Sequence, residues 1–231
     1  MMFDPTYLLF AAPGFVLALV AQLLTKSTFS KYSHVPSGRG LTGAQAARMM
    51  LQQNGITDVE IVAHEGFLTD HYDPRSKTLR LSEAVYASNS LSAVGVACHE
   101  AGHALQHAHG YAMLGLRTAL VPATNFGSTL SYLFIMVGFL LSAPSMITVG
   151  ALLFSLLVVF ALVTLPVEWD ASHRAKLAMV SSGLVTGEEA KGAAAVLNAA
   201  FLTYVASAVS ALLTLLYYLM RAGLLGGRRS D

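Results

Sequence analysis

Four long apolar stretches constrain the fold of this chain more than any other feature. A membrane-spanning helix needs about 20 predominantly apolar residues. Four segments meet this condition: Tyr7–Leu24, a segment that ends near Ala143 with its apolar centre at Leu130–Leu141, Met146–Leu165, and Ala199–Met220. Only 12% of the 231 residues are charged, against roughly 25% in soluble proteins. The sequence therefore predicts a mainly α, polytopic helical membrane protein with about four spans.

The charges beside the first span indicate an orientation. Asp4 precedes this span, whereas Lys26 and Lys31 follow it, so it lacks the basic start of a cleaved signal peptide and is expected to be an anchor. The positive-inside rule then places residues 25–118 in the cytoplasm of a multi-pass protein of the cell (inner) membrane. Three further basic residues fall on the same side: Arg117, Arg174 and Lys176. Three others would fall outside and disagree: Arg221, Arg228 and Arg229.

Residues 25–118 hold most of the polar character, and we expect them to form a small α+β domain at the membrane surface. Helical periodicity, turn residues and capping residues predict its elements. In order, they are a helix over Thr42–Asn54 that stops at Gly55, a strand over Val59–His64, a hairpin of Leu68–Tyr72 with Thr78–Leu81, and a helix over Leu91–His109 that is capped by Ser90 and ends at Gly110. Farther along, Thr186 and Glu189 have the spacing of a capping box, which predicts a helix that continues into the last span.

The helix over Leu91–His109 carries the sequence His99-Glu100-Ala101-Gly102-His103. Positions i and i+4 lie one turn apart on the same face of a helix, so one zinc ion can bind both imidazoles. Glu100 is close enough to accept a proton from a water on that zinc. Two histidines can share a helix face without any metal, but an unpaired glutamate in an apolar run is costly to bury. The motif therefore predicts two zinc ligands, His99 and His103, and a general base, Glu100.

A catalytic zinc usually has a third protein ligand. His109 follows His103 at the spacing that one zinc-protease class uses, but that class needs a glycine where this chain has Gln106. His107 lies on the right face but is two turns from His99. Both are expected to be ordinary helix-end histidines or partners of the site. The better candidate is Glu168, directly after the third span and on the same membrane side as His99, with Asp170 as the rival carboxylate.

The chain resembles the YugP-type neutral zinc metallopeptidases of bacterial membranes over nearly its whole length. The resemblance rests on Arg39–Gly43, Leu68–Arg75, His99–Ala108, Leu165–Glu168 and the pair Ala171-Ser172. That family is itself similar to the HtpX-type and CAAX prenyl proteases, which use two histidines and a glutamate in an E-x-x-A-D pattern. In those relatives the final aspartate supports a zinc histidine, and Ser172 stands in its place here.

The resemblance implies a zincin-like metalloprotease domain and a membrane-embedded zinc endopeptidase, with zinc on His99, His103 and Glu168 and with Glu100 as general base. Its partners would be the lipid bilayer and a protein or peptide substrate, including membrane proteins, and not nucleic acid. The edge of the predicted hairpin could pair with an extended substrate. Candidate donors to the oxyanion are His71, Tyr72, His173 and Arg174. The alternatives are a zinc or other metal transporter and a non-catalytic zinc-bearing membrane scaffold.

The predicted spans and the position of the zinc ligands divide the chain into six parts. Residues 1–25 are the anchor, 26–118 the metalloprotease domain, 119–166 a transmembrane hairpin, 167–198 the segment with the third zinc ligand, 199–221 the C-terminal span and 222–231 a tail.

Overall fold

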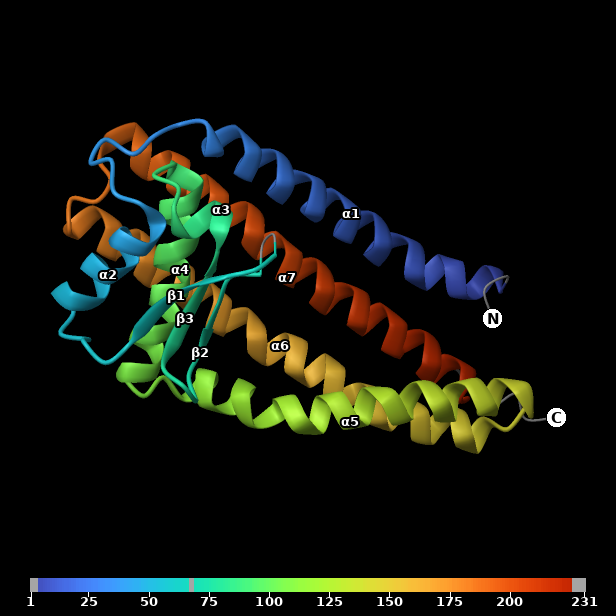
Figure 1. The fold of residues 1–231 in the computed structure, drawn as a ribbon. Helices are drawn as coiled ribbons and strands as arrows, with labels where there is room; N and C mark the ends of the chain where they lie inside the picture. Colours follow the sequence, from blue (N-terminus) through green and yellow to red (C-terminus); the bar gives the residue numbers. More distant parts are fainter. Residues whose placement is uncertain (1–3, 67–68, 226–231) are drawn as a thin grey trace. The chain divides into compact units, whose positions relative to one another are not determined.

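The computed structural model describes residues 4–66 and 69–225, and it confirms a mainly helical chain with a small sheet. Four of the described helices are long and apolar enough to cross a membrane. They are α1 (Pro5–Ser33), α5 (Ala112–Leu140), α6 (Pro144–Ser181) and α7 (Gly187–Arg221), as Figure 1 shows. The predicted capping-box helix does continue into the last span, since both belong to α7.

Two helix boundaries differ from the prediction. Helix α5 begins at Ala112, whereas the predicted transmembrane hairpin begins at residue 119. Helix α6 does not end with the third span but continues through Pro166. Proline removes one backbone hydrogen bond from a helix interior, but helices packed against other elements tolerate this loss. Glu168 is therefore held by the middle of a continuous helix and does not begin a new one.

The chain divides into two compact units, and the first is made of apolar helix segments. Its described residues are 4–21, 116–165 and 203–225. Helices α5 and α6 approach closely where Ser131 Oγ donates a hydrogen bond of 2.8 Å to the carbonyl of Gly150. Small residues permit such close backbone contacts between helices in a membrane. Near the two ends of the described chain, the Tyr217 hydroxyl donates to Asp4 Oδ2 at 2.8 Å, which joins α1 to α7.

The second unit, residues 22–115 and 166–202, contains the sheet. Its strands are β1 (Glu60–His64), β2 (His71–Asp73) and β3 (Thr78–Ser82), in the order β1-β3-β2. The hairpin of β2 and β3 is antiparallel, as predicted, and β1 adds in parallel to the other side of β3. The predicted start of the hairpin at Leu68 lies outside the described residues. The sheet lies beside α4 (Leu91–Ala108), which it helps to bury (Figure 1).

The two helices predicted for this unit begin and end within one residue of the expected bounds. Helix α2 (Gly43–Gln53) has Thr42 as its N-cap, in a complete capping box with Gln45. Helix α4 is capped by Ser90, whose hydroxyl accepts from the backbone N–H of Ala93 at 3.3 Å. Gly55 and Gly110 follow the two helices with φ values of 74° and 63°, which favour glycine. The short helix α3 (Glu83–Tyr86) was not predicted.

Helices α4 and α6 come into backbone contact at Gly102, inside the histidine motif. A Cβ atom at this position would lie 2.5 Å from the carbonyl oxygen of Ala171. Only a glycine permits such an approach, because the obstacle is backbone and cannot move aside as a side chain would. Gly102 directly precedes His103 on α4, and Ala171 follows Glu168 by three residues on α6. This contact therefore limits how far apart the two helices are where they carry His103 and Glu168.

We therefore expect Gly102→Ala to destabilise the protein by about 1–3 kcal/mol, the usual cost of overpacking. The measurement is thermal denaturation of the purified protein in detergent after chelator treatment, so that loss of metal does not contribute. The matched control is Gly115→Ala in α5, because nothing lies within 4 Å of a Cβ atom there. Equal melting temperatures for Gly102→Ala and the wild type would contradict the close contact.

Candidate metal centre

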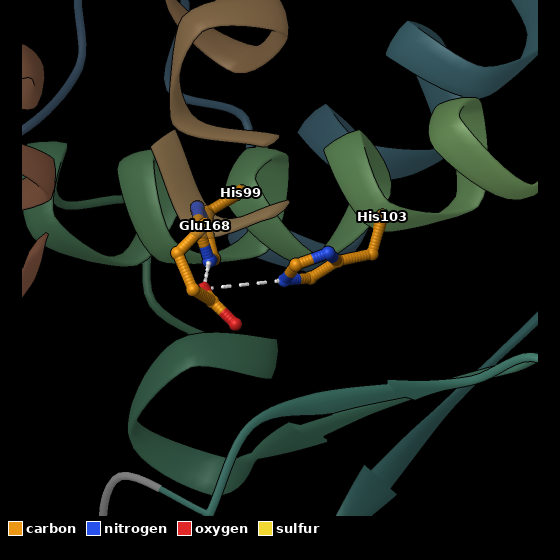
Figure 2. Close-up of side chains that lie close together, drawn as sticks. All are labelled: His99, His103 and Glu168. Carbon is orange, nitrogen blue, oxygen red and sulfur yellow. Dashed lines mark hydrogen bonds and ion pairs between the residues drawn. The ribbon is translucent and has the colours of Figure 1, made fainter. Parts of the chain in front are cut away.

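Two helices bring three potential metal ligands together. His99 and His103 lie one turn apart on α4, and their rings meet edge to face with centroids 4.8 Å apart. Glu168 reaches toward both rings from α6, as Figure 2 shows. Its Oε2 atom lies 3.2 Å from His99 Nε2 and 3.5 Å from His103 Nε2. The structure thus brings Glu168, rather than a second residue of α4, to the two motif histidines.

The donor set and its spacing fit a zinc ion. Zinc binds imidazole nitrogen and carboxylate oxygen at about 2.0–2.2 Å, so tetrahedral ligands are separated by about 3.3 Å. The two nitrogen-to-oxygen distances lie close to this value, and one ligand atom from each residue falls within 4.8 Å of the others. Among the residues that the structure describes, this is the one group of three such side chains able to hold a metal ion.

The site is buried, and the Glu168 carboxylate interacts electrostatically with both histidines. Glu168, which lies beyond the apolar Met146–Leu165 segment, is only 2% exposed. Burial alone would raise the pKa of its carboxyl, but hydrogen bonds and charge from His103 and His99 hold that pKa far below its usual range. Burial alone would lower the pKa of His103, but Glu168 and then Glu100 outweigh it and raise the pKa to about 9. The carboxylate therefore stays ionised, as a metal ligand must be.

Each imidazole is oriented by a partner on its other nitrogen. Ser172 Oγ lies 3.1 Å from His99 Nδ1, and Gln106 Oε1 lies 3.0 Å from His103 Nδ1. When each Nδ1 carries the proton and donates it to these oxygens, each Nε2 is left free to bind metal. Ser172 thus lies where the relatives with the E-x-x-A-D pattern have an aspartate that supports a zinc histidine.

Gln106 is the site residue that the sequence did not identify. It is fully buried, and its Nε2 donates to the carbonyl of Val167 and to Asp170 Oδ2, both at 2.8 Å. Asp170 also accepts from Arg174 Nε at 2.6 Å. Gln106 therefore ties His103 directly to the helix that carries Glu168. Its place one turn after His103 was the only signal, and a glutamine three residues from a histidine is common in helices without any metal.

Glu100 lies on α4 between the two histidines in sequence and is 8% exposed. Its negative charge contributes to the raised pKa of His103, so the carboxylate is near that ring. Within residues 4–66 and 69–225 the Glu100 side chain makes no hydrogen bond or ion pair. The Glu100 carboxylate therefore lies near His103 with no protein partner among the described residues, so its oxygens are available to a water molecule.

The other candidate ligands are engaged elsewhere. His107 Nδ1 lies 2.9 Å from the Tyr72 hydroxyl, and His109 Nδ1 lies 3.1 Å from Arg174 Nη1. Asp170, the rival carboxylate, accepts hydrogen bonds from Gln106 and Arg174. It is not one of the three side chains whose ligand atoms lie close enough together to hold a metal ion. Cys98 is fully buried, and burial raises the pKa of its thiol to about 12.

The four candidate oxyanion donors also have other partners. His71 Nδ1 lies 2.8 Å from the carbonyl of Thr69, and the His173 ring stacks on Trp169 with centroids 5.2 Å apart. Tyr72 bonds His107, and Arg174 bonds Asp170. No donor to the oxyanion is therefore assigned.

The comparison with protein families decides the class of this chain. The model of the family described as "Putative neutral zinc metallopeptidase" matches residues 7–223. The chain belongs to this neutral zinc metallopeptidase family. A zinc peptidase family is consistent with the His99, His103 and Glu168 group, and zinc is the expected metal of the site.

A related protein of known sequence supports this family assignment. The chain is 47% identical over 214 residues to "Putative membrane protease YugP" of Bacillus subtilis (strain 168), which covers 93% of this chain and 94% of that protein. The name of this relative and the four apolar helices both indicate a membrane protein. No solved structure gives a significant match.

We expect Gln106→Leu to weaken zinc binding about 10–100-fold, the usual cost of losing the partner that orients a histidine ligand. The measurement is competition for zinc with a chromogenic chelator. The control is Gln52→Leu, at an exposed position of α2 outside the site. Melting of the metal-free protein shows whether the Gln106 variant is folded, and an unchanged zinc affinity in a folded variant would refute the orienting role.

Proposed function

We propose that this protein is a membrane-embedded zinc endopeptidase in which His99, His103 and Glu168 hold the metal and Glu100 is the general base. The observation that supports this most strongly is the convergence of the three ligand atoms next to a glutamate with no protein partner among the described residues. Membership of a zinc peptidase family supports the reaction type. The substrate would be a protein or peptide, including membrane proteins.

The metal and the residues of the chain would have separate tasks. Zinc on these three ligands would supply a Lewis acid that polarises the peptide carbonyl and lowers the pKa of a water molecule toward neutrality. Glu100 would accept the proton from the attacking water and pass it to the leaving amine. Gln106 and Ser172 would hold the imidazoles in register through their Nδ1 atoms.

The sheet offers a way to bind an extended substrate. Strand β2 is at one edge of the β1-β3-β2 sheet, so one of its sides faces no strand of the described chain. An edge strand can pair with a peptide through backbone hydrogen bonds. Tyr72 on β2 reaches His107 on α4, so this edge lies beside the helix that carries Glu100. We propose that the substrate backbone runs along β2.

The metal transporter is less well supported. Transport sites lie within spanning helices near the membrane midplane. Helix α4 is not among the four candidate spans of the described chain. A non-catalytic scaffold would not need Glu100 to remain without a partner. The cytoplasmic position of the site stays a proposal, supported by the basic residues that follow the first span.

We expect Glu100→Gln to keep bound zinc and to lose about 10²–10⁴-fold in turnover, the usual contribution of a general base. The amide has the shape of the carboxylate but cannot accept the proton. The measurement pairs metal analysis with hydrolysis of denatured casein by the purified protein in detergent. The matched control is Glu60→Gln at an exposed position of β1.

Full hydrolysis by a zinc-loaded Glu100→Gln protein would overturn the role of Glu100. Absence of hydrolysis by the zinc-loaded wild type, with casein and with membrane-protein substrates, would favour the non-catalytic scaffold.

A further inference from the structure

A line of hydrogen bonds runs from the candidate zinc ligand His103 to a charged pair on α6. Gln106 Oε1 lies 3.0 Å from His103 Nδ1, and Gln106 Nε2 donates to Asp170 Oδ2 at 2.8 Å. Arg174 Nε donates to the same Asp170 oxygen at 2.6 Å. Asp170 is not one of the three candidate ligands, but one buried amide connects it to His103.

Two acceptors on α6 determine the direction of the Gln106 amide. A backbone carbonyl and an ionised carboxylate only accept hydrogen bonds. The Val167 carbonyl and Asp170 Oδ2 both accept from the amide nitrogen of Gln106, each at 2.8 Å. A reversed amide would direct its oxygen at these two oxygens. This is unfavourable, because Gln106 is fully buried and water cannot replace the lost hydrogen bonds.

The direction of this amide decides which nitrogen of His103 can bind zinc. With the amide oxygen toward Nδ1, Nδ1 carries the proton and donates it, and Nε2 is available to the metal. A reversed amide would present an N–H to Nδ1, so the proton of the neutral ring would have to be on Nε2. Because Nε2 is the atom that lies 3.5 Å from Glu168 Oε2, that proton would block zinc at this ligand.

Asp170 and Arg174 are themselves held in place. Their ion pair joins positions i and i+4 of α6, and both side chains are partly buried. On its other side, Arg174 Nη1 lies 3.1 Å from His109 Nδ1, and the guanidinium lies 5.8 Å from the centre of the Tyr111 ring. A hydrogen bond to a charged group is shorter and stronger than one between neutral groups. The ion pair thus offers Gln106 a fixed and strong acceptor.

We propose that Asp170 and Arg174 are positioning residues of the zinc site: their ion pair fixes the Gln106 amide and thereby keeps the proton of His103 on Nδ1. The inference rests on the zinc site of the proposed peptidase function, but it concerns metal binding and not hydrolysis. Asp170, which the sequence offers as a rival ligand, acts on His103 from two hydrogen bonds away.

The first test is a double-mutant cycle with Asp170→Leu and Gln106→Leu, measured by competition for zinc with a chromogenic chelator. We expect Asp170→Leu to weaken zinc binding about tenfold, the lower end of the usual range for a partner outside the ligands themselves. In the Gln106→Leu background the same change should cost less than about twofold, because residues that act through one another are not additive. The matched control is Asp73→Leu, a partly buried aspartate of β2 that also pairs with an arginine, Arg80, outside the ligand group.

A second variant keeps the test independent of folding. Melting of the metal-free protein shows whether Asp170→Leu is folded, and Asp170→Asn replaces it if it is not. The asparagine oxygen can still accept from Gln106 and Arg174, so the change removes the charge alone. We expect a smaller loss of zinc affinity than for Asp170→Leu, and this loss should again disappear in the Gln106→Leu background.

The second test observes the proton on His103. In the cobalt(II)-loaded protein, each ligand imidazole with a protonated Nδ1 gives its own shifted, exchangeable proton NMR signal, so His99 and His103 should give one signal each. Asp170→Asn should shift one of these signals, or remove it through exchange with water, and leave the other unchanged. Gln106→Leu should affect the same signal, whereas Ser172→Ala should affect the other.

The outcomes separate this inference from the proposed function. Equal losses of zinc affinity for the Asp170 change in the wild-type and Gln106→Leu backgrounds would overturn it, because Asp170 would then not act through Gln106. Unchanged affinity and unchanged signals in folded Asp170 variants would overturn it as well. A protein that shows the expected effects on zinc but hydrolyses no substrate would support the inference and overturn the peptidase proposal alone. A wild type that binds no zinc would overturn the metal site and the inference together.

Discussion

The structure of the site depends on one buried carboxylate. Glu168 is almost completely removed from water, and such a charge is tolerated in a protein interior only when it is paired and hydrogen-bonded. The His99 and His103 nitrogens supply this pairing from another helix. The close approach of α4 to α6 at Gly102 lets the two histidines reach Glu168, and Ser172 and Gln106 contact their Nδ1 atoms. Sixty-nine residues separate His99 from Glu168 in the chain, so the site forms only when both helices are in place.

This arrangement links metal binding to folding. A bound cation would take the place of the proton with which His103 pairs with Glu168, and its binding free energy would add to the stability of the packed helices. The pKa of His103, raised to about 9, means that protons compete with metal at neutral pH. Burial also suits the proposed catalysis, because packed neighbours hold Glu100, His103 and Glu168 in place.

Local features of this chain were predictable, and contacts between distant segments were not. The i, i+4 spacing of the histidines, the caps at Thr42 and Ser90 and the apolar lengths of the spans depend on neighbouring residues, and the structure agrees with them. The continuity of α6 through Pro166 was missed, because sequence rules treat an interior proline as a break. Gln106 was missed because its role depends on where α6 lies. Glu168 was predicted through chain connectivity and through resemblance to a family, not through local pattern.

X-ray absorption at the zinc edge of the purified, zinc-loaded protein tests the central claim most directly. The account predicts a first coordination sphere with two imidazoles and additional oxygen donors at about 2.0–2.2 Å. In Glu168→Ala the carboxylate oxygen should be lost and zinc should be released by a chelator far more readily, whereas His107→Ala should match the wild type. An unchanged spectrum and zinc content in Glu168→Ala, or a spectrum with a third imidazole, would contradict the assignment of Glu168.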